Sequence, residues 1–329
     1  MTEIIEWADR VYRIQAGSFG SSLDTAYIVD CGEKVAVIDT GSSELCGRGI
    51  LKGISESGHK VDDIGAIFLT HAHPDHLGGL RILSQAHEAK LFVHKNAQEI
   101  FEKGRNYALE KQFNIRGAGD KVALAFRTPI MSNYNKLPTP VYIDGTEDIT
   151  VGDETFVISS AGGHCADHIL IHAYQTRSTF IGDELGVAEG EFGYFFDLTG
   201  SPEQRKKSIK LMAKLKSEFL YPAHLPPIEK TDIPRITEEA LLSQSHFETT
   251  VMETLINYGK ARLDTLVTKI RQTLNIEWQT PFRELEVDET TLLVYLNGMI
   301  KSGSVRFDEK SKYYSFVEVE GDGKGDPHG

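Results

Sequence analysis

The chain has 329 residues, of which 40% are hydrophobic and 30 are glycine, a composition typical of an ordinary globular protein with one large or two modest domains. Its 48 acidic and 35 basic residues give a net charge of −13, which disfavours nucleic acid and anionic membrane surfaces as partners. The sequence contains neither a visible secretory signal nor an apolar run of roughly 18–20 residues, and its three cysteines lack the spacing of a disulfide framework. Composition therefore favours a cytoplasmic enzyme or binding module.

The first two thirds of the chain contain short β-branched and apolar runs that alternate with glycine-rich turns, a pattern that predicts β-strands. The run over residues 66–70 is continuous rather than alternating, which favours a strand buried on both faces. The predicted strands are 25–30, 35–39, 66–70, 148–151, 155–159, 168–174 and 178–181.

Helices are predicted between these strands. Ser201 followed by Pro202 and an acidic residue is a strong helix start, because serine caps the first turn and proline fits its first position. A second helix is predicted over Gln98–Phe113, where it opens an insertion at about residues 96–140. The resulting mixture of helices and strands is typical of an α/β fold over residues 1–235.

The composition changes after residue 235. A helical pattern begins at Thr237 and ends at Gly259, a natural C-terminal cap, and further helices are predicted over 263–274 and 290–300. Residues 304–307 and 313–316 are typical of a terminal hairpin. Helices followed by a hairpin predict a small winged-helix-like domain over residues 236–319, and the glycine-rich segment 320–329 predicts a disordered tail.

Histidines cluster in three short motifs, which hold six of the twelve in the chain. The first is HAHPDH at residues 71–76, directly after the predicted strand 66–70. His71 and His73, two apart in an extended chain, project to the same side and can bind one metal ion. The other motifs are GHCADH at residues 163–168 and PAH at residues 222–224, and Asp183 follows the predicted strand 178–181.

Neutral imidazoles and a few carboxylates at strand ends suit Zn²⁺, with Fe or Mn as alternatives. Clustered histidines can also be plain polar loop residues, and one such turn alone would fit that interpretation. Four motifs that each close a strand favour a metal site instead.

The order HxHxDH, His, Asp, His resembles the signature of the metallo-β-lactamase fold hydrolases, and Asp39 in the run IDTG matches the first motif of that family. The resemblance covers roughly residues 10–230 and implies a four-layer αββα fold. The GHCADH motif and the predicted C-terminal domain are similar to the branch of β-lactamase-like protein 2 and the lactonases.

The resemblance also implies a dinuclear site with two divalent metal ions. His71, His73 and His164 would bind the first ion, Asp75, His76 and His224 the second, and Asp183 would bridge the two. Asp39 and His168 would lie behind the ligands and orient them. These assignments cover the metal ligands His71, His73, Asp75, His76, His164, Asp183 and His224.

The mechanism that the resemblance implies uses a hydroxide shared by the two ions, because the ions lower the pKa of the bridging water. Asp75 would shuttle the proton, so Asp75 and Asp183 are the expected catalytic residues. No separate serine nucleophile is needed, and the sequence contains no GxSxG motif.

Other residues have more than one interpretation. Cys165 could line the site, but a small buried thiol is the simpler interpretation. An aromatic run at residues 191–197 could form a wall of the substrate pocket or pack in the core. The expected pocket residues are Tyr27, Tyr134, Phe192, Tyr194 and Phe195.

Three functions fit the sequence. The first is a hydrolase of small esters, lactones or thioesters, with phosphotriesters or phosphodiesters as side substrates. The second is an endoribonuclease of the β-lactamase-like protein 2 type, although acidic residues outnumber basic ones between Phe247 and Val319. The third is a binding protein on a hydrolase scaffold. We expect a small-molecule substrate, no membrane or nucleic-acid partner, and we leave a homodimer open.

Overall fold

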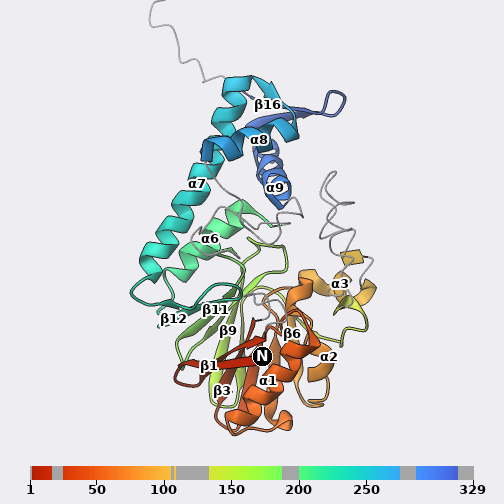
Figure 1. The fold of residues 1–329 in the computed structure, drawn as a ribbon, viewed down its shortest axis with the longest axis vertical. Coiled ribbons are helices and arrows are strands. Elements are labelled where there is room, and N and C mark those ends of the chain that lie inside the picture. Colours follow the sequence, from red (N-terminus) through yellow and green to blue (C-terminus); the bar gives the residue numbers. More distant parts are fainter. Residues whose placement is uncertain are drawn as a thin grey trace, which may run out of the picture.

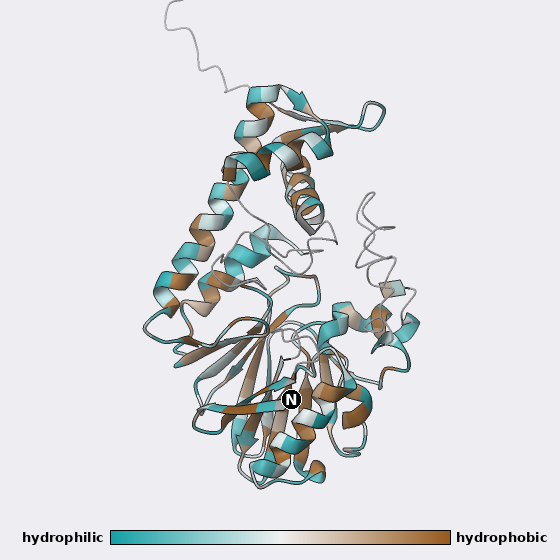
Figure 2. Cartoon of the chain, in the orientation of Figure 1, coloured by the Kyte–Doolittle hydropathy of each residue, from teal (hydrophilic) through white to brown (hydrophobic). Residues whose placement is uncertain are grey.

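The computed structural model describes residues 2–16, 25–104, 107–108, 133–186, 200–274 and 287–317. Two large β-sheets lie face to face in the lower part of the molecule, and a smaller sheet lies with the last helices at the other end (Figure 1). Apolar residues concentrate in the strands, whereas the helices alternate apolar and polar residues along their length (Figure 2).

The first sheet holds seven strands in chain order. Its first four strands pair antiparallel and its last four pair parallel, so that β4 belongs to both sets. Parallel strands are buried on both faces, which explains the continuous apolar run of β5. The strands are β1 (Thr2–Ala8), β2 (Val11–Ala16), β3 (Thr25–Cys31), β4 (Lys34–Ile38), β5 (Ile64–Phe68), β6 (Lys90–His94) and β7 (Val141–Ile143).

The second sheet has the strand order β13-β12-β11-β10-β9-β8. Only β11 and β12 pair in parallel within it, and a helix connects them. The strands predicted over 148–151, 155–159, 168–174 and 178–181 are all present, each within two residues of its predicted ends. The strands are β8 (Glu147–Val151), β9 (Glu154–Ser160), β10 (Ile169–Ala173), β11 (Ser178–Gly182), β12 (Phe219–Pro222) and β13 (Ile228–Glu229).

Three apolar clusters join the layers. One lies between the two sheets and contains Phe68 and Phe156, whose ring centroids are 5.0 Å apart. A second packs α1 (Glu44–Glu56) and α2 (Leu80–Leu83) on the outer face of the first sheet, and a third packs α6 (Pro202–Met212) and α7 (Ile233–Tyr258) on the second. These layers form the four-layer αββα fold that the sequence predicts.

Local capping residues set the helix ends. The Ser201 side chain accepts a hydrogen bond from the backbone N–H of Gln204 at 3.4 Å, as predicted for the start of α6. The predicted helix over Gln98–Phe113 is interrupted, because α3 (Gln98–Lys103) ends at Gly104. Tyr107 and Ala108 are again helical, and the rest of the predicted range lies outside the described residues. Gly104 has a φ of 69°, a left-handed conformation that suits glycine and stops the helix. Single turns of 3₁₀ helix are η1 (Val61–Asp63), η2 (Pro74–His76) and η3 (Lys95–Ala97).

Helix α7 belongs to two apolar clusters. Ile236 and Ala240 near its start pack with the second sheet, whereas Phe247, Val251 and Leu255 pack in a separate cluster with the last elements of the chain. In Figure 1 the helix runs from the sheets to the upper end of the molecule. The elements of that end are the later part of α7, α8 (Leu263–Leu274), α9 (Val287–Lys301), β14 (Lys260–Ala261), β15 (Val305–Asp308) and β16 (Tyr313–Phe316).

The end of α7 at Gly259 and the helix over 263–274 are confirmed, and α7 begins four residues before the predicted Thr237. The predicted domain boundary at residue 235 therefore falls within the first turn of α7. The winged-helix-like assignment stays a prediction, and the predicted tail at 320–329 lies outside the described residues. Within the described part of the chain, none of the helices combines the length and the apolar character needed to cross a membrane.

Candidate metal centre

The predicted ligands lie on loops that follow neighbouring strands of the two sheets. The HAHPDH loop follows β5, His164 lies between β9 and β10, Asp183 follows β11 directly, and His224 lies two residues after β12. Because these strand ends lie at the same edge of the facing sheets, residues as far apart in the chain as His71 and His224 meet at one buried place. The structure brings all seven predicted ligands together there.

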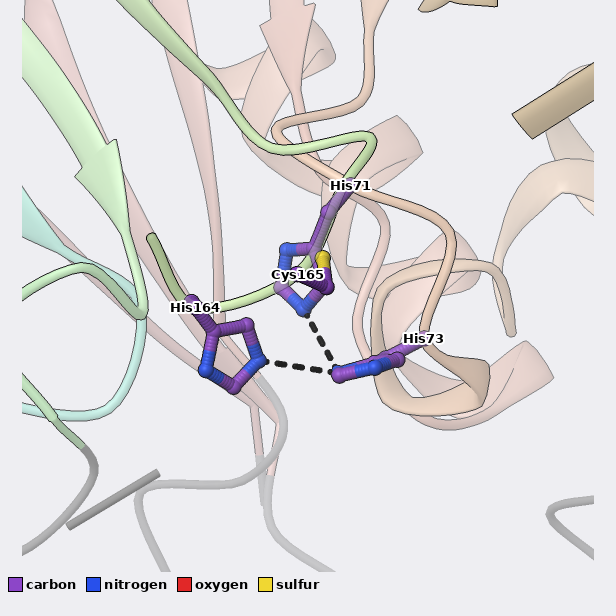
Figure 3. A group of neighbouring side chains, drawn as sticks. All are labelled: His71, His73, His164 and Cys165. Atoms are coloured by element: carbon purple, nitrogen blue, oxygen red, sulfur yellow. Dashed lines mark hydrogen bonds between the residues drawn. The ribbon is translucent and has the colours of Figure 1, made fainter. Parts of the chain in front are cut away.

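The first group of ligands consists of three histidines whose ring nitrogens converge. Nδ1 of His73 lies 3.0 Å from Nε2 of His71 and 3.0 Å from Nε2 of His164 (Figure 3). Cys165 adjoins this group, which has all its candidate ligand atoms within 4.8 Å of one another. Burial lowers the pKa of each of the three histidines, which favours the neutral imidazole that binds metal ions.

The second group contains two carboxylates and two histidines, also within 4.8 Å of one another. Nε2 of His224 lies 3.3 Å from Oδ2 of Asp75 and 3.3 Å from Oδ1 of Asp183. Nε2 of His76 lies 3.5 Å from Oδ2 of Asp183. Mixed imidazole and carboxylate donors of this kind suit Zn²⁺, Fe²⁺ or Mn²⁺.

Asp183 also faces the first group. Its Oδ2 lies 3.7 Å from Nε2 of His71 and 3.6 Å from Nε2 of His164, while Oδ1 faces His224. One carboxylate thus reaches both groups of ligand atoms, which is the position that a bridging ligand between two ions would need. The bridging role that the resemblance implies for Asp183 stays a prediction.

The charges of the second group depend on one another. Burial alone would raise the pKa of Asp75, but His76 and His224 lower it to about 2. Burial would also lower the pKa of His224, but Asp183 and Asp75 raise it to about 10. The same two histidines lower the pKa of Asp183 well below its usual range. Both carboxylates are therefore ionised at neutral pH and offer anionic oxygens to cations.

The donors fit two divalent cations on chemical grounds. Nε2 of His76 and Oδ1 of Asp183 are buried and make no hydrogen bond within the part of the chain that the structure describes. Buried polar atoms normally have partners, so such atoms call for an ion or another ligand. His71, His73 and His164 could hold one cation, and Asp75, His76 and His224 could hold the other, with Asp183 between them.

Asp39 lies behind His76, as the sequence predicts. Its Oδ2 lies 3.0 Å from Nδ1 of His76, so the carboxylate orients the ring and leaves Nε2 to face the centre. Asp39 also accepts hydrogen bonds from the backbone N–H and the hydroxyl of Thr70, both at 2.8 Å. Its φ of 55° lies in the left-handed region, which Asp tolerates better than most residues.

His168, the other predicted supporting residue, holds Asp183 through the main chain. The backbone N–H of Asp183 donates to Nε2 of His168 at 3.2 Å, and His168 is fully buried. Gly182 makes this contact possible, because a Cβ there would lie 2.5 Å from Nε2 of His168 and 2.7 Å from Oγ1 of Thr70. Its φ of 49° also favours glycine.

Two buried carboxylates support the ligand loops and were missing from the predicted site. Oδ2 of Asp167 accepts a hydrogen bond from the backbone N–H of Ala72, which lies between His71 and His73, at 2.8 Å. Oε2 of Glu184 accepts one from the backbone N–H of His164 at 3.0 Å. The DH pair in GHCADH was a signal for Asp167. Glu184 directly follows the predicted ligand Asp183, but no motif identifies it as a support.

The structure corrects the expected role of two tyrosines. The buried Tyr27 hydroxyl donates to the carbonyl of Pro222 at 2.5 Å, and the buried Tyr134 hydroxyl donates to the carbonyl of Ala72 at 2.9 Å. Each hydroxyl proton is used within the protein, so these tyrosines brace ligand loops rather than offer donors to a substrate. The other expected pocket residues, Phe192, Tyr194 and Phe195, lie outside the described residues.

Comparisons with known proteins agree with this geometry. The model of the metallo-β-lactamase superfamily matches residues 24–224. The lactamase-like protein nscB of Aspergillus fumigatus is 26% identical over 70% of this chain and 56% of its own length. The β-lactamase-like protein 2 homolog of Caenorhabditis elegans is 24% identical over 68% of this chain and 64% of its own length. The chain thus spans less than two thirds of either relative.

A solved structure extends the likeness in fold to nearly the whole chain. The metallo-β-lactamase family protein from Thermus thermophilus superposes with a TM-score of 0.68 at 18% identity, covering 95% of this chain and all of its own. At this identity the likeness shows the fold alone. The family match over residues 24–224, together with the αββα layers and the two ligand groups, establishes that the chain belongs to the metallo-β-lactamase superfamily of hydrolases.

Proposed function

We propose that the protein is a hydrolase of small ester-type molecules, namely lactones, esters or thioesters, with phosphotriesters or phosphodiesters as side substrates. The observation that carries the proposal is the position of Asp183, whose carboxylate faces both ligand groups. A carboxylate there could hold two ions close together, and two-metal hydrolases hold their ions about 3.5–4 Å apart. Zn²⁺ suits these imidazole and carboxylate donors best, and Fe and Mn are the alternatives.

When bound, two divalent cations ionise water near neutral pH and polarise the oxygen of the scissile bond. The protein contributes the placement of the ligands and the handling of the proton. Asp75 presents a carboxylate oxygen to the centre, 3.3 Å from Nε2 of His224, and we propose it as the group that accepts the proton that the nucleophilic water loses. His224, 3.3 Å away, fixes the orientation of that carboxylate.

The exposure of the ligands indicates the side from which a substrate enters. The Asp75 side chain is 17% exposed, whereas those of His224 and Asp183 are 2% and 3% exposed. A substrate that enters over Asp75 would bring its reacting bond beside the proposed proton acceptor. A centre so deeply buried favours small substrates over a bulky polymer.

Three hydroxyl and thiol groups beside the centre, in the part of the chain that the structure describes, are poor nucleophiles. The Thr70 hydroxyl donates to Asp39, and the Tyr134 hydroxyl donates to a backbone carbonyl. Burial raises the pKa of the Cys165 thiol well above its usual value, so Cys165 stays protonated. These contacts support attack by water rather than by a protein side chain.

A hydrolysis panel on metal-reconstituted protein tests the proposal. It compares lactones, aryl esters, thioesters, phosphate esters and single-stranded RNA. We expect turnover of ester-type substrates by the unmodified protein and by His87→Ala, which alters an exposed histidine. We expect turnover to fall to the uncatalysed rate in His71→Ala. Turnover of RNA without turnover of esters would refute the proposal and favour the endoribonuclease.

A further inference from the structure

A cavity of about 680 Å³ lies at the end of the second sheet that is remote from the metal centre. Arg177, which lines it, precedes β11, whereas Asp183 follows β11. The two residues are six steps apart, which is roughly 20 Å at about 3.3 Å per residue. His172 of β10 lines the cavity together with the end of α6 at Ala213 and the start of α7 at Ile233. The cavity is therefore separate from the proposed active site.

The rim of the cavity is basic in a chain that is strongly acidic overall. Arg177, Lys216 and Lys230 line it, and no acidic residue is among the lining residues. Glu218 lies nearby and partly neutralises two of them, because its Oε1 is 3.1 Å from Nη1 of Arg177 and 2.9 Å from Nζ of Lys230. Lys216 forms no ion pair with any residue in the described segments.

The remaining lining residues offer an apolar floor and two fixed polar groups. Leu215, Ile233 and Pro234 provide aliphatic surface, and the exposed ring of Tyr174 stands at the edge. Nδ1 of His172 lies 2.8 Å from Oγ1 of Thr179, which in turn lies 2.6 Å from Oγ of Ser217. This chain of hydrogen bonds occupies Nδ1 and leaves Nε2 of His172 for a ligand in the cavity.

We propose that this cavity binds a small organic anion, one that carries a carboxylate, sulfonate or phosphate group on an apolar body. The three cations would attract the charged group, and the aliphatic floor and the Tyr174 ring would cover the body. The start of α7 at Ile233 adds the positive end of a helix dipole on the same side. Glu218 competes with the anion for Arg177 and Lys230.

Binding of naphthalene-2-sulfonate to the full-length, metal-loaded protein tests this proposal by calorimetry at low salt. We expect saturable binding at one site that weakens with added salt. Naphthalene-2-methanol, the uncharged analogue, and inorganic sulfate, which lacks the apolar body, are both expected to bind more weakly. Equal binding of the uncharged analogue, or equal binding of sulfate, would overturn the proposed class of ligand.

Substitutions of residues in and beside the cavity test whether the anion binds there. Arg177→Ala and Lys216→Ala should each weaken binding roughly two- to fivefold, the range for one exposed ion pair. Glu218→Gln should strengthen it by a similar factor, because it frees two cations. Lys210→Ala, an exposed lysine of α6 outside the cavity, is the matched control, and His71→Ala excludes the metal centre as the site. Unchanged affinity in the first three variants, or lost affinity in His71→Ala, would refute the proposal.

Discussion

Nε2 of His168 accepts a hydrogen bond from the backbone N–H of Asp183, and this contact ties the loop before β10 to the loop that carries Asp183, the proposed bridging carboxylate. His168 is held in turn near Glu184, whose Oε2 lies 3.6 Å from Nδ1 of His168. Glu184 also accepts from the backbone of His164. The loops of Asp183 and His164 therefore share one buried support, which places ligands of both proposed ions relative to each other.

Replacing His168 should loosen this support. In His168→Ala the N–H of Asp183 loses its acceptor in a buried place, which costs about 1–3 kcal/mol of unfolding free energy. We also expect metal affinity to fall roughly 10–100-fold, as for other residues that orient ligands. Chemical denaturation and titration against a chromophoric chelator measure the two effects. His87→Ala, at the surface, is the control, and unchanged metal affinity in His168→Ala would contradict the role.

Asp183 should determine whether two ions bind close together. We expect the unmodified protein to bind two ions per chain, less than about 4 Å apart. Asp183→Ala removes the carboxylate that faces both ligand groups, so it should abolish turnover and lower the stoichiometry without unfolding the chain. Elemental analysis of protein purified without chelator, with circular dichroism as the check on folding, tests this. Two bound ions with near-normal kcat in Asp183→Ala would contradict it.

The two ligand groups should respond differently to pH. Burial keeps the pKa values of His71, His73 and His164 below 6.5, so an ion entering the first group displaces no proton above that pH. In the second group the carboxylates raise the pKa values of both His76 and His224, that of His224 to about 10, against the effect of burial, so an ion must displace protons there. Below the pKa of a protonated histidine, each proton that the ion displaces makes the apparent metal affinity rise about tenfold per pH unit.

Metal titrations between about pH 6.5 and pH 8 would measure this difference. The first binding step should be nearly independent of pH, and the second should tighten as the pH rises. Asp75→Asn removes one of the two carboxylates that raise the pKa of His224, so it should make the second step less dependent on pH. Two steps with the same pH dependence would contradict the assignment of protons to the second group.

The convergence of the proposed ligands could be predicted from sequence because each belongs to a short motif that ends a strand. HAHPDH places four ligands within six residues, and the strand before it is marked by its continuous apolar run. His164, Asp183 and His224 were predicted in the same way, each at a strand end. The order of these motifs, rather than any single motif, identified the fold.

Two supports, Asp167 and Glu184, were not predicted, because their contacts join residues far apart in the chain. Asp167 accepts from Ala72, 95 residues earlier, and Glu184 meets α6 through Ser208. The two tyrosines were instead predicted in the wrong role. The sequence alone does not distinguish a tyrosine hydroxyl that faces a substrate from one that donates to a backbone carbonyl. Tyr27 and Tyr134 prove to be braces only because of the carbonyls that the fold places beside them.

The last prediction concerns the end of the chain, where RNA binding and a purely structural role are the alternatives. Helix α7 is common to the hydrolase layers and to the C-terminal cluster, and Gln244 near its middle accepts from Arg205 of α6 at 3.2 Å and donates to the carbonyl of Pro202 at 2.9 Å. A truncation after Pro234 would remove Ile236 and Ala240, the residues of α7 that pack on the second sheet.

We therefore expect truncation after Pro234 to lower stability more than truncation after Ser245, which keeps the first half of α7. The full chain should bind single-stranded RNA only weakly, because acidic residues outnumber basic ones after residue 246 and phosphate binding needs several unopposed cations. Titration with RNA at several salt concentrations, alongside thermal unfolding of both truncated chains, measures these effects. Tight binding with a steep salt dependence that is lost after truncation at Ser245 would instead support the endoribonuclease.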